Sequence, residues 1–236
     1  MAQAPLSKVR FKYIKTNPIM TELIIIGAGG HAAEINEYIN YAQDPSDLHP
    51  IIIKGFLDDN PQNYKAYQFT APYLGNISEH IISSNVTYLM GIANLKHRRT
   101  IIEKFLKKGA SFISFTHKTA YVSPSSVIGM GSIIGPNANI GPNVKIGEFN
   151  LINSRCSLGH DTQMGNYNFI SPNVCFSGFT VIGHENLFGI NSVTIPNITV
   201  GNNNKIAAGM VLDQNVKDDE VVFYRFKEKV IAVPKK

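Results

Sequence analysis

A histidine stands directly before an aspartate in the stretch CSLGHDTQMG, residues 156–165. An imidazole with a reference pKa of about 6.5 can accept a proton near neutral pH, and an adjacent carboxylate can fix which ring nitrogen carries the proton. His160 and Asp161 could therefore be a general base with its orienting acid, part of a metal site, or a polar pair in solvent. Because neighbouring side chains of a strand point to opposite faces, the two can touch only at an outward-facing corner, where Gly159 would permit a bend. The residues alone favour the solvated pair.

A metal site at His160 would need about three protein ligands that converge on one cleft. The only other histidine between residues 118 and 236 is His184. It stands 24 residues later, which the repeat described below places at a different corner. We therefore expect no metal.

The second candidate for chemistry is the turn GAGGHA, residues 27–32, which fits the pattern G-x-G-x-x-G/A between a strand and a helix. Such glycines let the backbone approach a diphosphate, and the helix N-terminus offers unpaired N–H groups to its negative charge. Asp58 and Asp59 end the next apolar run and could accept hydrogen bonds from a ribose. The alternatives are a tight turn for the glycines and a solvated turn for the aspartates. We favour a nucleotide site, because both features fall at the carboxyl ends of neighbouring strands.

The elements that would position this site alternate between strand and helix. Apolar runs within residues 21–26, 51–61 and 86–94 predict buried strands, and apolar side chains recur at helical spacing in residues 31–42 and 95–110. Strands alternating with helices imply a parallel sheet, because each crossover helix must cover a face. This part of the chain is therefore predicted to be an α/β domain of the Rossmann-like kind.

From residue 122 to residue 212 an apolar side chain returns at every sixth position, with Thr194 as the one exception. Glycine directly follows nine members of this series, and we interpret it as a turn-permissive residue. A period of six is typical of a parallel β-helix, in which three six-residue sides complete a coil of 18 residues. We expect about five coils stacked about 4.8 Å apart. The general crossover rule predicts a right-handed turn.

The net charge of +5 gathers at the two ends of the chain. Four basic residues and no acidic residue precede residue 20, and five basic residues follow residue 224. The stretch between them is mildly acidic, which argues against a continuous phosphate-binding face for nucleic acid. We expect residues 1–19 to be a disordered extension, residues 225–236 to be a tail, and no nucleic-acid partner.

Cys156 and Cys175 are the only cysteines. Such sparse use of cysteine indicates free thiols in a reducing compartment, so we expect a cytoplasmic protein. The longest aliphatic run near the start, residues 23–26, ends at Gly27 and is far too short for a membrane span. We expect no membrane insertion.

The repeats, in which an aliphatic residue is followed by glycine and four others, come after LIIIGAGGHA. Together they resemble the hexapeptide-repeat sugar acyltransferases of the NeuD and PglD type, over residues 21 to about 220. The resemblance implies a left-handed parallel β-helix after the α/β domain, a homotrimer with active sites between subunits, and acetyl-CoA bound along the prism. It assigns residues 20–115 to binding a nucleotide-activated amino sugar and residues 116–224 to acyl transfer.

The same resemblance implies roles for single residues. His160 would be the general base and Asp161 would orient it. Asn153 would lie near the acceptor group of the sugar, with an asparagine ladder inside the coil as the alternative. Contacts with the nucleotide sugar would come from Gly29, Gly30, His31, Asp58, Asp59 and Asn94, the last a partial match. Contacts with acetyl-CoA, mainly through backbone groups, would come from Ser171, Gly178, Gly189, Ile190 and Ala208, although a plain corner is the alternative for the glycines.

Two features depart from the pattern of these relatives. Phe169 stands where many of them carry a second histidine nine residues after the base. The end of the chain, VVFYRFKEKVIAVPKK, lacks the Gly-Val-Pro-Ala-Lys stretch that relatives place beside CoA. Both departures concern contacts with CoA.

The implied activity is N-acetylation, by acetyl-CoA, of the amino group of a nucleotide-linked amino sugar in surface glycan biosynthesis. O-acetylation of a sugar or of sialic acid stays open, and so does a non-catalytic trimer that only binds the nucleotide sugar. An NAD enzyme, suggested by the glycine turn alone, lacks an identifiable partner for hydride transfer.

Overall fold

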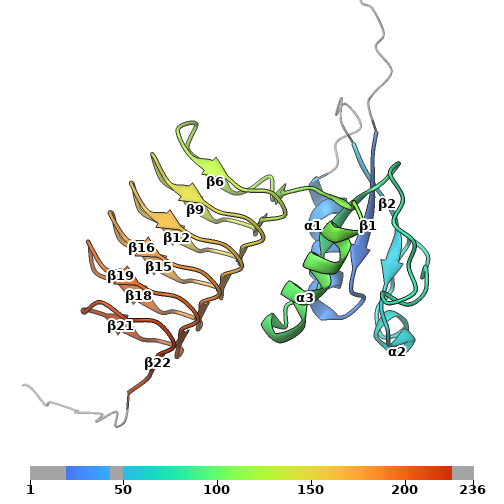
Figure 1. The fold of residues 1–236 in the computed structure, drawn as a ribbon. Helices are drawn as coiled ribbons and strands as arrows, with labels where there is room; N and C mark the ends of the chain where they lie inside the picture. Colours follow the sequence, from blue (N-terminus) through green and yellow to red (C-terminus); the bar gives the residue numbers. More distant parts are fainter. Residues whose placement is uncertain (1–19, 43–49, 225–236) are drawn as a thin grey trace, which may run out of the picture.

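The computed structural model describes residues 20–42 and 50–224, so the extension expected at residues 1–19 and the tail expected at residues 225–236 lie outside the described residues. An α/β domain is followed by a left-handed parallel β-helix, which confirms the predicted fold class (Figure 1). The division proposed at residue 115 stays a prediction. The first strand that pairs within the β-helix is β5 (Phe115–Thr116).

The α/β domain is built on a four-stranded parallel sheet in the order β2-β1-β3-β4. Its strands are β1 (Thr21–Ile26), β2 (Ile51–Leu57), β3 (Thr87–Met90) and β4 (Ser111–Phe112). Its helices are α1 (Gly30–Ala42), α2 (Pro61–Lys65) and α3 (Leu95–Lys107). The strand order reverses between β1 and β3, and open parallel sheets bind their ligands at such a reversal.

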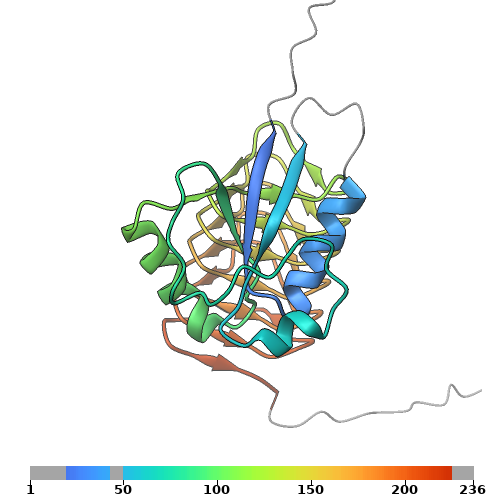
Figure 2. The ribbon, with the colours of Figure 1, turned by 90° about the vertical axis from the view of Figure 1, so that its right-hand side faces the viewer.

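Burial on both faces explains the unbroken aliphatic run of β1. Leu23 and Ile25 share a buried cluster with Ile35 of α1. Ile24 shares a second cluster with Ile102 of α3. Successive side chains of a strand point to opposite faces, so α1 and α3 cover opposite faces of the sheet, as Figure 2 shows.

The β-helix is a three-sided prism of two-residue parallel strands. The seven-stranded side contains β5, β8 (Ile133–Ile134), β11 (Leu151–Ile152), β14 (Phe169–Ile170), β17 (Leu187–Phe188), β20 (Lys205–Ile206) and β22 (Val221–Val222). The six-stranded side contains β6 (Tyr121–Val122), β9 (Asn139–Ile140), β12 (Ser157–Leu158), β15 (Cys175–Phe176), β18 (Val193–Thr194) and β21 (Val211–Leu212). The five-stranded side contains β7 (Val127–Ile128), β10 (Lys145–Ile146), β13 (Gln163–Met164), β16 (Val181–Ile182) and β19 (Thr199–Val200).

Partners in neighbouring coils are 18 residues apart, as Lys145 and Gln163 are, which confirms the predicted coil length. The β-helix makes about six turns, where about five were expected, because coils continue past both ends of the apolar series. The last coil is two residues shorter, since Lys205 pairs with Val221. The right-handed turn taken from the crossover rule is wrong. That rule describes a helix packing back onto a twisted sheet, and no such helix joins these two-residue strands.

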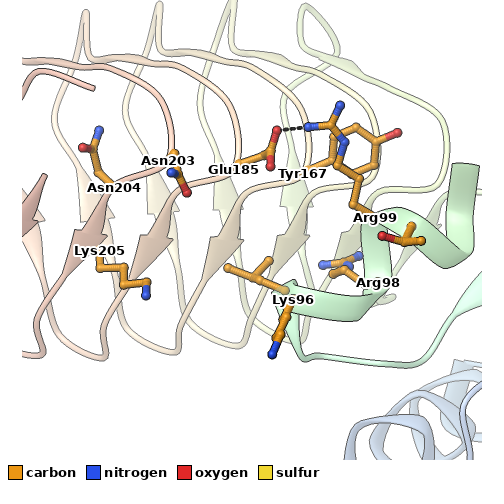
Figure 3. Close-up of a pocket in the computed structure, with 10 residues that line it drawn as sticks. Lys96, Arg98, Arg99, Tyr167, Glu185, Asn203, Asn204 and Lys205 are labelled. Carbon is orange, nitrogen blue, oxygen red and sulfur yellow. Dashed lines mark hydrogen bonds and ion pairs between the residues drawn. The ribbon is translucent and has the colours of Figure 1, made fainter. Parts of the chain in front are cut away.

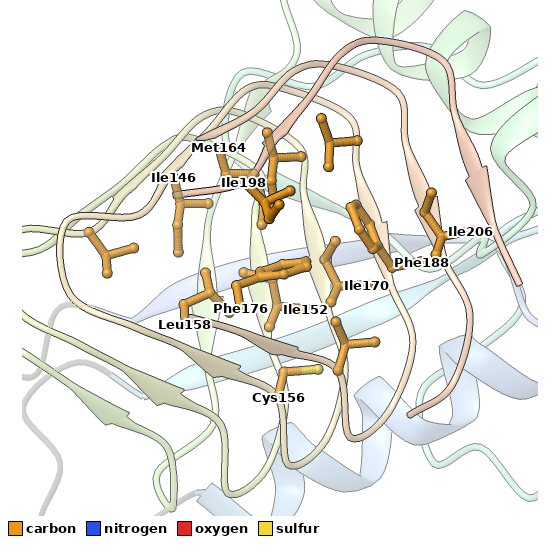
Figure 4. Packing of buried hydrophobic residues seen from close by; sticks show 14 of the residues in the cluster. Ile146, Ile152, Cys156, Leu158, Met164, Ile170, Phe176, Phe188, Ile198 and Ile206 are labelled. Carbon is orange, nitrogen blue, oxygen red and sulfur yellow. The ribbon is translucent and has the colours of Figure 1, made fainter. Parts of the chain in front are cut away.

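Each side of a coil buries two side chains, and only one of them belongs to the apolar series. The apolar series fills the centre, where Phe176 and Phe188 meet edge to face at 4.8 Å between ring centroids (Figure 4). The second inward residue stands two positions earlier and is often small or polar. The buried side chains of Asn150, Asn168 and Asn186 form a ladder in which each backbone N–H donates to the Oδ1 of the asparagine one coil before, at 2.9 Å for both steps.

The bends of the β-helix lie at a different position from the one expected. The turn expected at the glycine after each inward residue is not there, because the φ of Gly159 is not positive. Glycine stands there because coils stack closely: a Cβ on Gly159 would lie 2.7 Å from the backbone N of Gly178. The left-handed backbone conformation falls two residues later, at Asp161, whose φ is 60°. Asparagine and aspartate adopt this conformation more readily than other side chains do.

The α/β domain packs on the seven-stranded side, where Phe115, Ile133 and Leu151 share the buried cluster of β1 and α1. We name the three edges of the prism by what they adjoin. The α3 corner includes residues 165–168 and 183–186, the α1 corner includes residues 153–156 and 171–174, and the far corner includes residues 159–162 and 177–180. The far corner joins the six- and five-stranded sides, so it lies opposite the α/β domain.

Within the described ranges, no helix has the length and apolar character needed to span a membrane.

Candidate active site

All six residues expected to contact the nucleotide sugar line one cavity of about 510 Å³. The cavity lies at the carboxyl ends of β1, β2 and β3, where the strand order reverses. These six are Gly29, Gly30, His31, Asp58, Asp59 and Asn94. The structure therefore brings together residues that are up to 65 positions apart in the sequence.

The two aspartates differ in what is left free for a ligand. Asp58 is 8% exposed, and both of its carboxylate oxygens accept backbone hydrogen bonds. Oδ2 accepts from the Ala28 N–H at 2.8 Å and Oδ1 accepts from the Asn60 N–H at 2.9 Å, so the side chain stabilises the turns after β1 and β2. Asp59 is exposed, and its Oδ1 accepts from the Ser78 N–H at 3.2 Å. Asp59 is therefore the better placed of the two for a direct contact with a nucleoside.

His31 lies in the first turn of α1 and Asn94 is the N-cap of α3, and both helices border the cavity. The Nδ1 of His31 lies 3.2 Å from Oε2 of Glu34, while its Nε2 is buried and has no hydrogen-bond partner among the described residues. The side-chain oxygen of Asn94 accepts from the Lys96 N–H at 3.0 Å and caps α3. Sequence reasoning missed Asn60, whose position directly before Pro61 is the signature of a helix start.

His160 and Asp161 touch at the far corner. Nδ1 of His160 lies 2.8 Å from Oδ2 of Asp161, and Oδ1 of Asp161 accepts from the side-chain amide of Asn143 at 3.2 Å. The hydrogen bond from His160, then that from Asn143, lowers the pKa of the Asp161 carboxyl. Because an ionised carboxylate can only accept, Nδ1 donates to it, and in the neutral ring Nε2 then has a lone pair.

The surroundings of His160 leave room for a substrate. The side chain is 56% exposed, and no described residue hydrogen-bonds its Nε2. A Cβ on Gly178 would lie 2.6 Å from Nε2, so any residue other than glycine at this position would clash with the imidazole in its present position. Phe179, which is 53% exposed, meets the imidazole edge to face at 5.1 Å. Sequence reasoning missed Asn143 and Phe179, although the 18-residue period places both in the column of Asp161.

The other residues expected at acetyl-CoA or at the acceptor sugar lie on a different edge from His160. Asn153 donates from its amide to the Ile170 carbonyl at 2.8 Å, and it does not take part in the asparagine ladder described above. Ile190 is 44% exposed. The residues that share the α1 corner are Asn153, Ser171, Gly189, Ile190 and Ala208. Within one chain the structure therefore brings only Gly178 next to the histidine pair.

His184 lies at the α3 corner, where its Nδ1 accepts from the Asn166 N–H at 2.9 Å. It is on a different edge of the prism from His160. In the described part of the chain, no three His, Cys, Asp or Glu side chains are grouped in a way that could hold a metal ion.

Comparison with known proteins gives the class of this fold. Residues 22–105 match the family model described as the PglD N-terminal domain. The structure resembles the acetyltransferase domain of PglB from Neisseria gonorrhoeae FA1090 in complex with acetyl coenzyme A, with a TM-score of 0.72, 26% identity, and coverage of 85% of this chain and 94% of that one. It also resembles PerB from Caulobacter crescentus, solved with CoA and GDP-perosamine, with a TM-score of 0.73, 22% identity, and coverage of 85% and 92%.

A relative in Bacillus subtilis (strain 168) is described as a UDP-N-acetylbacillosamine N-acetyltransferase. It is 28% identical over 114 residues, which make up 48% of this chain. The match spans half the length of that protein, 50%. The predicted resemblance to sugar acyltransferases of the PglD type is confirmed.

Proposed function

We propose that this chain is an acetyl-CoA-dependent N-acetyltransferase that acts on the amino group of a nucleotide-linked amino sugar. The observation that carries the proposal is the His160–Asp161 pair, whose Nε2 is free beside Gly178. The cavity of the PglD-type domain supports it, and so do the two relatives above 25% identity, one bound to acetyl coenzyme A and one described as acting on a UDP-linked sugar. From the resemblance we place the product in surface glycan biosynthesis.

In the proposed reaction the nitrogen lone pair of the sugar amine attacks the thioester carbonyl carbon of acetyl-CoA. A C–N bond forms, the C–S bond breaks, and the products are the acetamido sugar and CoA. The proton lost by the amine passes to Nε2 of His160 and from there to the thiolate of the leaving CoA. Asp161 holds the ring by its Nδ1–H and stabilises the imidazolium that forms in between. Backbone N–H groups near Gly178 would stabilise the oxyanion.

We also propose that the active form is a homotrimer whose sites each combine two subunits. The nucleotide cavity belongs to the α/β domain on the seven-stranded side, and His160 lies at the opposite corner of the same chain. The acetyl-CoA candidates at the α1 corner are likewise apart from His160. A rotation of neighbouring copies about one axis would bring the far corner of one chain beside the α1 corner and the cavity of the next.

The proposal is tested by incubating the purified chain with acetyl-CoA and a UDP-linked amino sugar. Release of CoA thiol together with the gain of one acetyl group on the sugar nitrogen, seen by mass spectrometry, is the expected result. Acetylation of a hydroxyl group would replace the N-acetyl assignment with an O-acetyl one. Binding of the nucleotide sugar without any acetyl transfer would contradict the enzymatic proposal.

A further inference from the structure

A second cavity, of about 440 Å³, lies between the first turns of α3 and the α3 corner of the β-helix (Figure 3). It shares no lining residue with the nucleotide cavity. It is also on a different edge of the prism from His160. The proposed acetyl transfer therefore makes no use of it.

Arg98 is the residue of this cavity that most needs an explanation. Its side chain is 1% exposed, and none of its three guanidinium nitrogens has a hydrogen-bond partner among the described residues. Burial lowers the pKa of Arg98 to about 10, so the group still carries its charge at neutral pH. A buried charge is costly unless an opposite charge and hydrogen bonds compensate it.

The one acidic residue of the lining, Glu185, is engaged elsewhere. It forms an ion pair with Arg99, which also pairs with Glu103 at 2.7 Å. The guanidinium of Arg99 lies over the ring of Tyr167, 5.3 Å from its centroid. Glu103 and Glu185 therefore compensate Arg99, and no acidic group of the described residues forms a hydrogen bond or an ion pair with Arg98.

Two further cations complete the lining. Lys96, in the first turn of α3, and Lys205, on β20, both line the cavity, and neither forms an ion pair with a described residue. Figure 3 shows Arg98 and Lys96 on the helix side of the cavity, with Lys205 on the β-helix side. Three cations from two parts of the fold thus have no acidic partner among the residues that the structure describes.

We propose that this cavity is a second ligand site, in which Arg98, Lys96 and Lys205 bind a phosphoryl group. A guanidinium matches the spacing of two phosphate oxygens and donates to both, which makes it the side chain best suited to a phosphoryl group in a buried position. A phosphate monoester carries close to two negative charges at neutral pH and suits several cations better than a single carboxylate does. A ligand here would tie α3 to the β-helix, so it would couple the position of the α/β domain to the catalytic prism.

The phosphoryl group could belong to free phosphate or pyrophosphate, or to a nucleotide. Calorimetric titration of the Gly29→Val chain in phosphate-free buffer with pyrophosphate, and separately with UDP, distinguishes the two sources. This variant is used for both probes, because the substitution blocks the diphosphate-binding turn of the nucleotide cavity and leaves the second cavity unchanged. Binding of either probe supports the site and identifies its source. No binding of either one at millimolar concentration overturns it.

Substitutions assign the binding to these residues. Lys205→Gln, at an exposed position, should weaken binding about tenfold, and Arg98→Met should abolish it. Lys104→Gln on the exposed face of α3, outside the cavity, should leave binding unchanged. Because Arg98→Met removes an uncompensated buried charge, its melting temperature in phosphate-free buffer should not fall. Undiminished binding by both cavity variants would overturn the proposal, and so would a large fall in the melting temperature of Arg98→Met, since that would show that Arg98 already has a partner.

Discussion

At the scale of single residues, the proposed chemistry depends on a tautomer. The contact between Nδ1 of His160 and the Asp161 carboxylate selects the neutral tautomer in which Nε2 has the lone pair, and Gly178 keeps the space beside Nε2 open. A base that acts on the attacking amine needs both conditions. The sequence suggested the pair, but the bend that makes the contact possible is at Asp161 and not at Gly159.

His160→Ala should lower kcat by about 10² to 10⁴, the usual contribution of a general base, with little change in the binding of either substrate. Steady-state kinetics and calorimetry measure the two effects separately. His184→Ala is the matched control, because it removes an exposed histidine from another edge of the same β-helix, and it should keep the native rate. If His160→Ala turns over at the native rate, the histidine pair is only a solvated corner.

Asp161→Asn should lower kcat less than His160→Ala, because the proton acceptor remains and only its orientation suffers. The variant should also be less stable than the native chain above about pH 4, the ordinary range of an aspartate carboxyl. The sign follows from the lowered pKa of Asp161: its ionised form is favoured in the fold, so this stabilisation is present at neutral pH and is lost as the pH falls through the lowered value. In thermal melts of both proteins from pH 7 downward, the difference between the two melting temperatures should shrink once the pH falls below about 4. A difference that stays constant or grows over that range would contradict this account of the pair.

At the scale of elements, the turn between β1 and α1 forms the floor of the nucleotide cavity. Gly27 has a φ of 106°, and a Cβ there would lie 2.7 Å from Cγ1 of Ile92, so a side chain would disturb the fold. A Cβ on Gly29 meets nothing within 4 Å. Gly29 is therefore the position where a side chain occupies the cavity without a folding penalty.

Gly29→Val should abolish binding of the nucleotide sugar and leave both the melting temperature and acetyl-CoA binding near native values. Gly27→Val, in the same loop, should instead lower the melting temperature. Calorimetry with a UDP-linked sugar and thermal melts make the comparison. Native binding of the sugar by Gly29→Val would show that the diphosphate lies elsewhere.

The asparagine ladder should be the most sensitive polar element of the β-helix. Asn168→Leu would leave the Asn186 N–H and the Gly183 carbonyl without their partners inside the coil. Each unpaired buried group costs about 1–3 kcal/mol, so we expect a loss of stability on the order of 3 kcal/mol. Chemical denaturation measures this loss of stability. Asn197→Gly is the control, because Asn197 is exposed, lies at a corner and has a positive φ. A loss no larger than that of the control would mean that the ladder adds little to the fold.

The β-helix also shows what the sequence could and could not predict. Its 18-residue coil follows from the apolar series alone, because each member points inward at the same place in its turn. The second inward column was missed, because Asn168 and Asn186 look like surface residues until the coils are stacked and their amides pair. Gly159 was misinterpreted because glycine serves equally well for a bend and for a close approach of two backbones.

At the scale of the whole molecule, the six cavity residues could be predicted together. Each follows a strand of one parallel sheet or lies at the start of the helix after that strand, so all six fall at the same edge of the sheet. The acetyl-transfer site could not be assembled in the same way. Its candidates lie on two edges of the prism, and a sequence does not say which edges meet in an assembly. The proposal of a two-subunit site follows from that separation.

The proposed assembly predicts a mass of about three times 26.0 kDa in solution. Exposed apolar side chains on the far and α1 corners and the sides between them, such as Phe179, Ile190 and Val211, supply surface for contacts between copies. Light scattering at micromolar concentration measures the mass. A monomer that still turns over would contradict a site shared by two chains.

The central claim, that the base and the sugar belong to different subunits, is tested most directly by mixing two inactive variants. His160→Ala keeps its cavity and Gly29→Val keeps its base. A site is therefore complete when its base comes from a Gly29→Val chain and its cavity comes from a His160→Ala chain. When the two chains are co-expressed in equal amounts, about a quarter of the sites should be complete. We predict that each variant alone keeps at most about a hundredth of the native rate and that the mixture recovers about a quarter of it. A mixture as inactive as its two components would show that each chain must supply both the base and the cavity, and would contradict the account.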